Sequence, residues 1–196
     1  FWSRQPVFHY HNLLLWLSHE GIIDEDIPSR INKYFSYEIA FLKTSDLSKE
    51  NKKKSYELIS NHYLRTKNEA YCPTPASIFE YFYKQNNCFI SMHFSNRQLI
   101  STMTSRPLDC KIKGKQFTTN YVDFLCVHGK HRKKGVAPKT IYTHIVYCRE
   151  NSDNKTFFFK REGRMTSIVP MTTYTTYGCK VSGKKHRLHH ARIKNI

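Results

Sequence analysis

The sequence predicts an α+β fold in which a mixed, mostly antiparallel sheet is flanked by helices. Two observations support this class. Segments with helix-cap residues and helical spacing of apolar residues come first, and shorter alternating segments separated by turn residues follow. The chain has 196 residues, which suffices for one domain with a sizeable core. Its low glycine and proline content argues against disorder, so we expect a single folded domain.

Two helices are expected in the first half of the chain. Thr44 or Ser45 can cap a helix that runs from about residue 46 to residue 64, because a hydroxyl at this position accepts from an unpaired backbone N–H. Thr74 can cap a second helix. Pro75 then occupies its first position, where the missing N–H has no intrahelical partner to lose.

The second half predicts a strand meander, a helix and further strands. The segment 88–94 alternates apolar and polar residues, as a half-buried strand does. The elements expected after it are a turn at 96–97, a strand over 99–104, a turn at 113–115, a strand over 116–127, a helix over 139–148, a strand over 156–160 and a short strand at 168–169.

The stretch 123–138 is the most informative part of the sequence. An apolar run, 121–127, ends in a basic turn that leads into the expected helix. Unpaired N–H groups and the helix dipole place partial positive charge at a helix start. The turn adds the full charges of Lys130, Arg132, Lys133 and Lys134. The pattern therefore predicts a site for a phosphate or a pyrophosphate.

Known phosphate-binding motifs narrow the choice of ligand. Neither Gly-x-x-x-x-Gly-Lys-Ser/Thr nor Gly-x-Gly-x-x-Gly occurs in the chain. The pattern Arg132-x-x-Gly135-x-Ala137 fits instead the loop with which GNAT-type acyltransferases hold the pyrophosphate of an acyl-CoA. In a basic protein, the same six residues also fit a solvated charged turn. The choice between this turn and a pyrophosphate-binding loop therefore depends on the flanking sequence.

Two longer blocks of sequence extend the match. Residues 124–138 read Phe-Leu-Cys-Val-His, then a basic turn, then Val-Ala-Pro, and residues 1–7 read Phe-Trp-Ser-Arg-Gln-Pro-Val. Both blocks, and the features between them, resemble the eukaryotic N-myristoyltransferases, one branch of the GNAT superfamily. The resemblance covers only the first of the two GNAT-like halves of that family.

The resemblance implies a single GNAT-like, acyl-CoA-binding fold. Its parts would be an N-terminal arm over the cofactor (1–34), the GNAT-like domain (35–179) and a basic C-terminal tail (180–196). It also implies an activity, the transfer of an acyl group from myristoyl-CoA or a similar acyl-CoA to the N-terminal glycine amine of a protein or peptide. The acyl-CoA is then a co-substrate, and no tightly bound cofactor is expected.

The resemblance assigns site residues one by one. In that family the strand before the anion loop carries a bulge whose amides face the thioester carbonyl. The matching residues are Phe124 and Leu125, whose backbone N–H groups would form an oxyanion hole. Ordinary strand packing is the alternative for both. Contacts to acyl-CoA are implied for Phe1, Trp2, Cys126, Val127, Arg132, Lys133, Lys134, Gly135, Val136, Ala137 and Pro138. Packing within the protein is the alternative for Phe1, Trp2 and Cys126.

Three departures from the family bear on catalysis. Asp123 replaces the family's asparagine, and its carboxylate can either take a proton from an ammonium group or repel CoA. The family's general base is its C-terminal carboxylate, a role that Ile196 could take only if the tail folds back. The family's Tyr-Thr-Ala-Gly segment has no matching threonine over 159–163. Acyl-CoA binding is therefore better supported than peptide acylation.

Charge favours a second hypothesis. The net charge of +17 exceeds what one CoA requires, and the tail contributes six basic residues with no acid: Lys180, Lys184, Lys185, Arg187, Arg192 and Lys194. Such a tail is typical of proteins that bind nucleic acid or an acidic partner. The alternative is thus a catalytically inactive, repurposed fold with a structural or nucleic-acid-binding role. Richness in Lys, Asn, Tyr and Phe is typical of AT-rich genomes, such as those of a parasite or a large DNA virus. A third option is acyl transfer to another amine.

The remaining composition bounds location and cofactors. No two of the six cysteines lie closer than sixteen residues, which favours reduced thiols and a cytoplasmic location, or the host cytoplasm or virion for a viral protein. No apolar run reaches about 18 residues, so we expect no membrane span. No metal site is expected, because the histidines of the tail, His186, His189 and His190, have no carboxylate or cysteine nearby.

Overall fold

One five-stranded sheet organises the part of the chain that the computed structural model describes, residues 1–17, 21–65, 70–83, 85–161 and 167–175. Its order is β1-β2-β3-β4-β5, and all neighbours are antiparallel except the parallel pair β4 and β5. The predicted α+β class with a mixed, mostly antiparallel sheet is confirmed. The strands are β1 (Ile39–Lys43), β2 (Phe89–Ser95), β3 (Gln98–Ile112), β4 (Lys115–Val127) and β5 (Phe157–Phe159).

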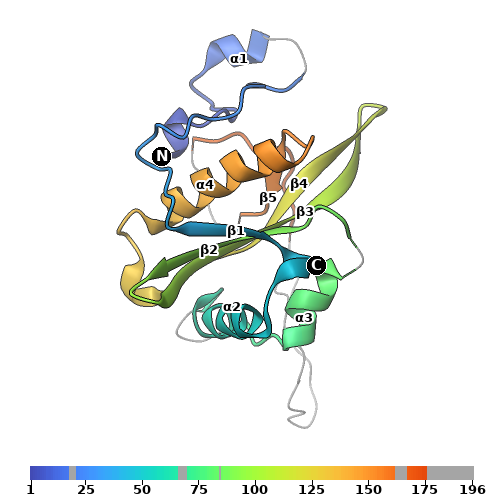
Figure 1. Ribbon diagram of the computed structural model, residues 1–196. Coiled ribbons are helices and arrows are strands. Elements are labelled where there is room, and N and C mark those ends of the chain that lie inside the picture. Colours follow the sequence, from blue (N-terminus) through green and yellow to red (C-terminus); the bar gives the residue numbers. More distant parts are fainter. Residues whose placement is uncertain (18–20, 66–69, 84, 162–166, 176–196) are drawn as a thin grey trace.

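Helices cover both faces of the sheet and give the domain three layers (Figure 1). Helix α4 (Val136–Asn151) lies on one face, and α2 (Lys49–His62) and α3 (Pro75–Phe79) lie on the other. None of the described helices is long and apolar enough to cross a bilayer. The shorter elements are α1 (Leu13–Leu17) and the 3₁₀ helices η1 (Trp2–Arg4), η2 (Thr44–Asp46), η3 (Glu80–Phe82) and η4 (Gly129–His131).

The helix starts differ in part from the sequence predictions. The cap at Thr44 or Ser45 was the wrong choice, because Ser48 caps α2 by accepting a hydrogen bond from the backbone N–H of Asn51. The chain before it forms the 3₁₀ turn η2 instead. The cap at Thr74 is confirmed by a reciprocal capping box with Ser77.

Helix α4 begins three residues earlier than predicted, at Val136 rather than at residue 139. The reason is the position of Pro138, which lies in the first helical turn. Proline is tolerated there, since the N–H groups of the first turn have no intrahelical acceptors.

Two strands also differ from prediction. Strand β1 was not predicted, and β3 continues to Ile112 instead of ending near residue 104. The pairing of β3 with β2 ends at Ser105, so that β3 beyond this point has β4 as its partner in the described sheet. Pro107 is compatible with such a one-sided ribbon, because a missing N–H on the open side breaks no ladder bond. The resulting hairpin projects from the sheet (Figure 1).

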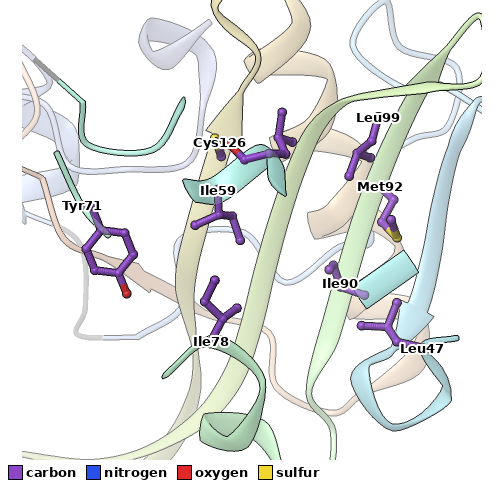
Figure 2. Close-up of a cluster of buried hydrophobic side chains, with 9 residues drawn as sticks. Leu47, Ile59, Tyr71, Ile78, Ile90, Met92, Leu99 and Cys126 are labelled. Atoms are coloured by element: carbon purple, nitrogen blue, oxygen red, sulfur yellow. Dashed lines mark hydrogen bonds between the residues drawn. The ribbon is translucent and has the colours of Figure 1, made fainter. Parts of the chain in front are cut away.

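The apolar core lies between the sheet and the α2–α3 layer. Figure 2 shows Ile59 of α2 and Ile78 of α3 near each other on one side of the cluster, and Ile90 and Met92 of β2 on the other side. The buried cluster consists of Leu47, Leu58, Ile59, Tyr71, Ile78, Ile90, Met92, Leu99 and Cys126. Burial of aliphatic side chains of this size contributes roughly 1.5–3 kcal/mol each. This face therefore supplies much of the stability of the fold.

The opposite face, beneath α4, contains buried polar groups that bond to one another. His144 of α4 is fully buried, and its ring nitrogens lie 2.8 Å from the hydroxyls of Ser91 and Ser105. Burial lowers the pKa of His144 to about 3, so the imidazole is neutral. The hydroxyl of Thr140, also on α4, donates to the hydroxyl of Ser101 at 3.0 Å. Small hydroxyl side chains thus let α4 lie close to the sheet while every group of this network is satisfied.

Candidate functional site

Strand β4 carries a β-bulge shortly before its end. The register of β3 against β4 shifts between Thr102 and Thr104, so that Phe124 and Leu125 lie opposite the single residue Met103. Neither of the two bulge residues has a partner in the register of the described sheet. A bulge of this kind re-aims the backbone and is frequent beside active sites.

The backbone at the bulge is in an unusual conformation. Phe124 has a φ of +47°, in the left-handed region that bulky side chains rarely adopt. Its ring packs against Tyr63, with centroids 5.6 Å apart, and against Tyr71 at 6.4 Å. Packing of the side chain therefore holds the backbone in a conformation that would otherwise be unfavourable.

The sheet opens beside the bulge. Strands β4 and β5 pair only over residues 120–122 and 157–159, and β4 then continues to Val127 after β5 has ended. A cavity of about 1380 Å³ lies at this parting, and Asp123, Phe124 and Leu125 form part of its wall. The bulge therefore borders a space large enough for a substrate.

The cavity wall is mainly aromatic and aliphatic. It combines side chains of the N-terminal arm, of α4 and of β5, among them Trp2, Tyr34, Ile141, Tyr142, Ile145, Phe157, Phe158 and Phe159. Charged side chains such as Arg149, Lys155 and Arg161 also line it. A wall with a large apolar part and some basic groups suits an extended apolar ligand that carries a charged end.

The N-terminal arm is fixed by specific contacts. Trp2 stacks on Phe159 at a centroid distance of 5.2 Å, and Phe1 meets the edge of Trp2 at 5.0 Å. The buried ring of His9 lies 3.0 Å from the carbonyl oxygen of Trp2. Further along the arm, the Tyr142 hydroxyl of α4 donates to the carbonyl of Ser29 at 2.9 Å. The arm thus closes one side of the cavity, and Trp2 both packs on the protein and lines the cavity.

The basic loop after β4 leads directly into α4. Lys133 and Gly135 adopt positive φ values of 61° and 76°, which turn the chain sharply. Gly135 is the N-cap of α4, and the N–H groups of Val136 and Ala137 belong to its first turn. The side chains of residues 133 and 134 are exposed. An anion can bind at such a helix start through backbone N–H groups and lysine charges.

Arg132 has contacts that its sequence position did not suggest. Its Nε donates to the carbonyl of Val127 at 3.2 Å, and an Nη donates to the carbonyl of His62 at the end of α2. A guanidinium has five N–H donors, and two of them attach the loop to the end of β4 and to the end of α2. Its role as a phosphate ligand stays a prediction.

The structure divides the predicted site residues between two places. Trp2, Asp123, Phe124 and Leu125 line the cavity. Phe1, Val127 and the loop residues 132–138 are not part of its described lining. Cys126 lies in the apolar core with its Sγ 3.5 Å from the Leu58 carbonyl oxygen, and burial raises the pKa of its thiol to about 12. The terminal carboxylate of Ile196 and the tail 180–196 lie outside the described residues.

Sequence analysis missed Arg106, whose side chain lies beside Asp123. Its Nε is 3.6 Å from the Oδ2 of Asp123. Its guanidinium lies 4.6 Å from the ring centre of Tyr81 and 4.9 Å from that of Tyr121. The hairpin turn could have revealed this arrangement, because a turn at 113–114 places residue 106 opposite residue 121.

Burial shapes the electrostatics of this group. It raises the pKa of the Asp123 carboxyl to about 6, and the nearby Arg106 guanidinium partly opposes the shift. Burial also raises the pKa of Tyr71, Tyr81 and Tyr121, and the negative charge of Asp123 adds to the effect. A carboxylate with a pKa near neutrality is suited to accept a proton.

Comparisons with known proteins identify the family and the fold. The sequence matches the acetyltransferase (GNAT) domain over residues 43–181. Two Saccharomyces cerevisiae N-myristoyltransferase structures with bound myristoyl-CoA are similar in fold. One gives a TM-score of 0.62 at 19% identity, covering 81% of this chain and 37% of that chain. The other gives 0.57 at 21% identity, covering 77% and 37%. The chain therefore spans about 37% of the length of these relatives.

A smaller enzyme has a similar fold over nearly its whole length. An aminoglycoside acetyltransferase from an uncultured soil metagenomic sample, solved in complex with trehalose, gives a TM-score of 0.50 at 17% identity, covering 72% of this chain and 95% of that chain. No curated protein matches the sequence. The resemblance to the GNAT-like half of the N-myristoyltransferases is confirmed at the level of the fold.

Proposed function

This chain belongs to the acetyltransferase (GNAT) domain family, and from this premise we propose that it transfers an acyl group from an acyl-CoA to an amine. One observation carries the proposal. The bulge at Phe124 and Leu125 borders the cavity at the parting of β4 and β5. Backbone amides displaced from a ladder at such a place can bind the oxyanion that forms when an amine attacks a thioester.

The donor would occupy the apolar cavity and the basic loop together. The acyl chain would lie against the aromatic wall, and the phosphates would bind at the start of α4, near Lys133, Lys134 and the amides of Val136 and Ala137. The arm with Phe1 and Trp2 would cover the cofactor. Myristoyl-CoA is the proposed donor, because the long apolar wall and the similarity to N-myristoyltransferases both favour a long acyl chain.

The chemistry requires no nucleophilic side chain. The amine attacks the thioester carbonyl directly, and the amides of Phe124 and Leu125 stabilise the negative oxygen of the tetrahedral intermediate. Each such donor lowers the barrier by roughly 3 kcal/mol. The proposed acceptor is the N-terminal glycine of a protein or peptide. Among the described residues, Asp123 is the proposed carboxylate that accepts a proton from its amine.

Isothermal titration of the full chain with myristoyl-CoA tests the proposal, with free CoA and a short polyanion as controls. We expect myristoyl-CoA to bind well above both controls. Gly135→Trp should abolish this binding, because a side chain at a φ of 76° distorts the N-cap that opens the anion site. Equal affinity for myristoyl-CoA and the polyanion would contradict the donor site.

The charge of +17 favours a second candidate, an inactive fold that binds nucleic acid or an acidic partner through residues 180–196. Phosphate contacts release counterions, so such binding weakens steeply with salt. Deletion of residues 180–196 should then flatten the salt dependence of binding to a short duplex. A chain that transfers acyl groups and binds the duplex only weakly would rule this candidate out.

A further inference from the structure

We propose that Asp123, Arg106 and the tyrosines around them form the acceptor subsite, which binds the ammonium group of the acceptor and removes its first proton. The inference rests on the proposed acyl transfer and names the side chains that would receive the second substrate. It assigns to this chain an internal base, so that a terminal carboxylate is not required. The substrate class is a primary ammonium group that can reach into the cavity.

The first argument is the state of the ion pair. The Oδ2 of Asp123 and the Nε of Arg106 are buried and have no hydrogen-bond partner among the described residues, because the 3.6 Å between them is too long for a hydrogen bond. Arg30 and Glu150, an exposed pair, instead form two hydrogen bonds of 2.9 Å and 2.6 Å. A buried carboxylate that serves only stability is normally hydrogen-bonded. The side chain of Asp123 is 24% exposed and lines the cavity, so its carboxylate can accept from a ligand there although Oδ2 itself is covered.

The second argument is position. Asp123 immediately precedes the bulge and lines the same cavity as Phe124 and Leu125. The hydroxyl of Thr104 donates to its backbone carbonyl at 3.0 Å, which fixes the start of the bulge. A proton acceptor in this place is adjacent to the amides that would hold the thioester oxygen, as direct attack by an amine requires.

The third argument is the aromatic surrounding. Tyr71, Tyr81 and Tyr121 line the cavity with Asp123, and each comes from a different segment of the chain. Faces of aromatic rings attract cations, and a carboxylate among them adds a full opposite charge. Tyr81 and Tyr121 also hold the Arg106 guanidinium, which keeps this cation beside the carboxylate. Arg106 thus occupies these two rings, and the Asp123 carboxylate is the group of the cluster that would bind the acceptor ammonium.

The proton and electron balance is complete. The acceptor ammonium gives one proton to the Asp123 carboxylate, and the neutral amine forms an N–C bond with the thioester carbonyl carbon. The C–S bond breaks and its electron pair leaves with sulfur. The second proton of the nitrogen goes to the CoA thiolate, and Asp123 returns its proton to water. Amide and CoA thiol are the products, and no other reactant is needed.

The test measures binding of a tetrapeptide with an N-terminal glycine to the full chain saturated with a thioether analogue of myristoyl-CoA. The N-acetylated peptide lacks the ammonium and serves as the ligand control. Asp123→Asn removes the charge with almost no change in shape. Asp109→Asn, in the projecting hairpin, removes an exposed carboxylate outside the cavity and is the matched control.

We expect Asp123→Asn and acetylation each to weaken binding by roughly tenfold to a hundredfold, and Asp109→Asn to leave it unchanged. Binding to the unmodified chain should also weaken below about pH 6, where Asp123 becomes protonated. The groups that face Asp123 are Arg106, Tyr71, Tyr81 and Tyr121. Arg106→Lys should retain part of the binding and keep the dependence on pH.

The possible failures are distinguishable. If the analogue itself does not bind, the donor site and hence the proposed function fail. If it binds but the free and acetylated peptides bind alike, or Asp123→Asn binds like the unmodified chain, the acceptor subsite alone is overturned. The comparison of the free with the acetylated peptide uses the unmodified chain, so a folding defect in Asp123→Asn would not leave the question open.

Discussion

Two buried polar groups on opposite faces of the central sheet differ in their hydrogen-bond partners. Beneath α4, both ring nitrogens of His144 lie 2.8 Å from serine hydroxyls. On the α2–α3 face, Asp123 and Arg106 approach only to 3.6 Å, and the facing atoms are buried without hydrogen bonds. A neutral histidine with two partners has little capacity left for a ligand, whereas an unsatisfied carboxylate beside a cavity retains it. The difference separates a structural network from a candidate reactive group.

The same contrast appears in the direction of the pKa shifts. Burial lowers the pKa of His144 to about 3 and raises that of Asp123 to about 6. The neutral form is favoured in both cases, but the consequences at neutral pH are opposite. His144 is then in its preferred form, while Asp123 is ionised at a cost in stability. Functional sites commonly carry such a cost.

The largest expected effect tests the bulge itself. Leu125→Pro removes one backbone N–H of the proposed oxyanion hole, so the rate of acyl transfer should fall by roughly 10²–10³ while acyl-CoA still binds. Leu125→Ala keeps the N–H and is the control, with a much smaller loss expected. Single-turnover rates with the glycyl peptide give the measurement. Equal rates for the two variants would mean that this amide does not stabilise the transition state.

A stability measurement tests the other face. His144→Leu leaves the hydroxyls of Ser91 and Ser105 without their buried partner, so the free energy of unfolding should fall by roughly 2–4 kcal/mol. His11→Ala, at an exposed position, should change it by less than about 0.5 kcal/mol. Urea unfolding at pH 7 provides both values. A loss of activity in His144→Leu without a loss of stability would contradict its structural role.

The dependence on pH should then have opposite signs on the two faces. The folded-state pKa of His144 is lowered, so its contribution to stability is present above about pH 6.5 and is lost as pH falls toward 3. That of Asp123 is raised, so its contribution is present below about pH 3.8 and is lost as pH rises through 6.

Transfer activity requires the ionised form of Asp123. The rate should therefore fall about tenfold per pH unit below pH 6, and this decline should be absent in the Asp123→Asn variant. Rates between pH 5 and 8, with acyl-CoA saturating, measure it. An identical acidic limb in both proteins would assign the titration to another group.

Sequence reasoning reached the fold and one part of the site for identifiable reasons. Local signals were sufficient where one side chain acts on its own segment, as in the capping box at Thr74. They failed where a choice between neighbours depends on tertiary packing, as with Ser48, which follows the buried Leu47. Arg106 was missed because its partner, Asp123, is seventeen positions away and meets it only through the register of the β3–β4 hairpin.

The smallest expected effect concerns the basic loop, where sequence and structure give Arg132 different roles. Its hydrogen bonds to the carbonyls of Val127 and His62 attach the loop to β4 and to α2, and a lysine cannot make both. Arg132→Lys should therefore lower the free energy of unfolding by about 1 kcal/mol and the melting temperature by roughly 2–4 °C. Because the charge is retained, the affinity for acyl-CoA should change by less than about threefold.

Lys134→Ala is the matched variant, since its side chain is exposed in the same loop. It should reduce acyl-CoA affinity by about threefold to tenfold at low salt and leave the melting temperature unchanged. Calorimetry of binding and of unfolding separates the two roles. A large loss of affinity in Arg132→Lys with unchanged stability would show instead that its guanidinium turns from the carbonyls to the phosphates when the donor binds. Arg132 would then be a ligand-binding residue like Asp123, although it is hydrogen-bonded within the protein. The presence of hydrogen-bond partners would therefore separate structural from ligand-binding groups only among buried side chains, as it does for His144 and Asp123.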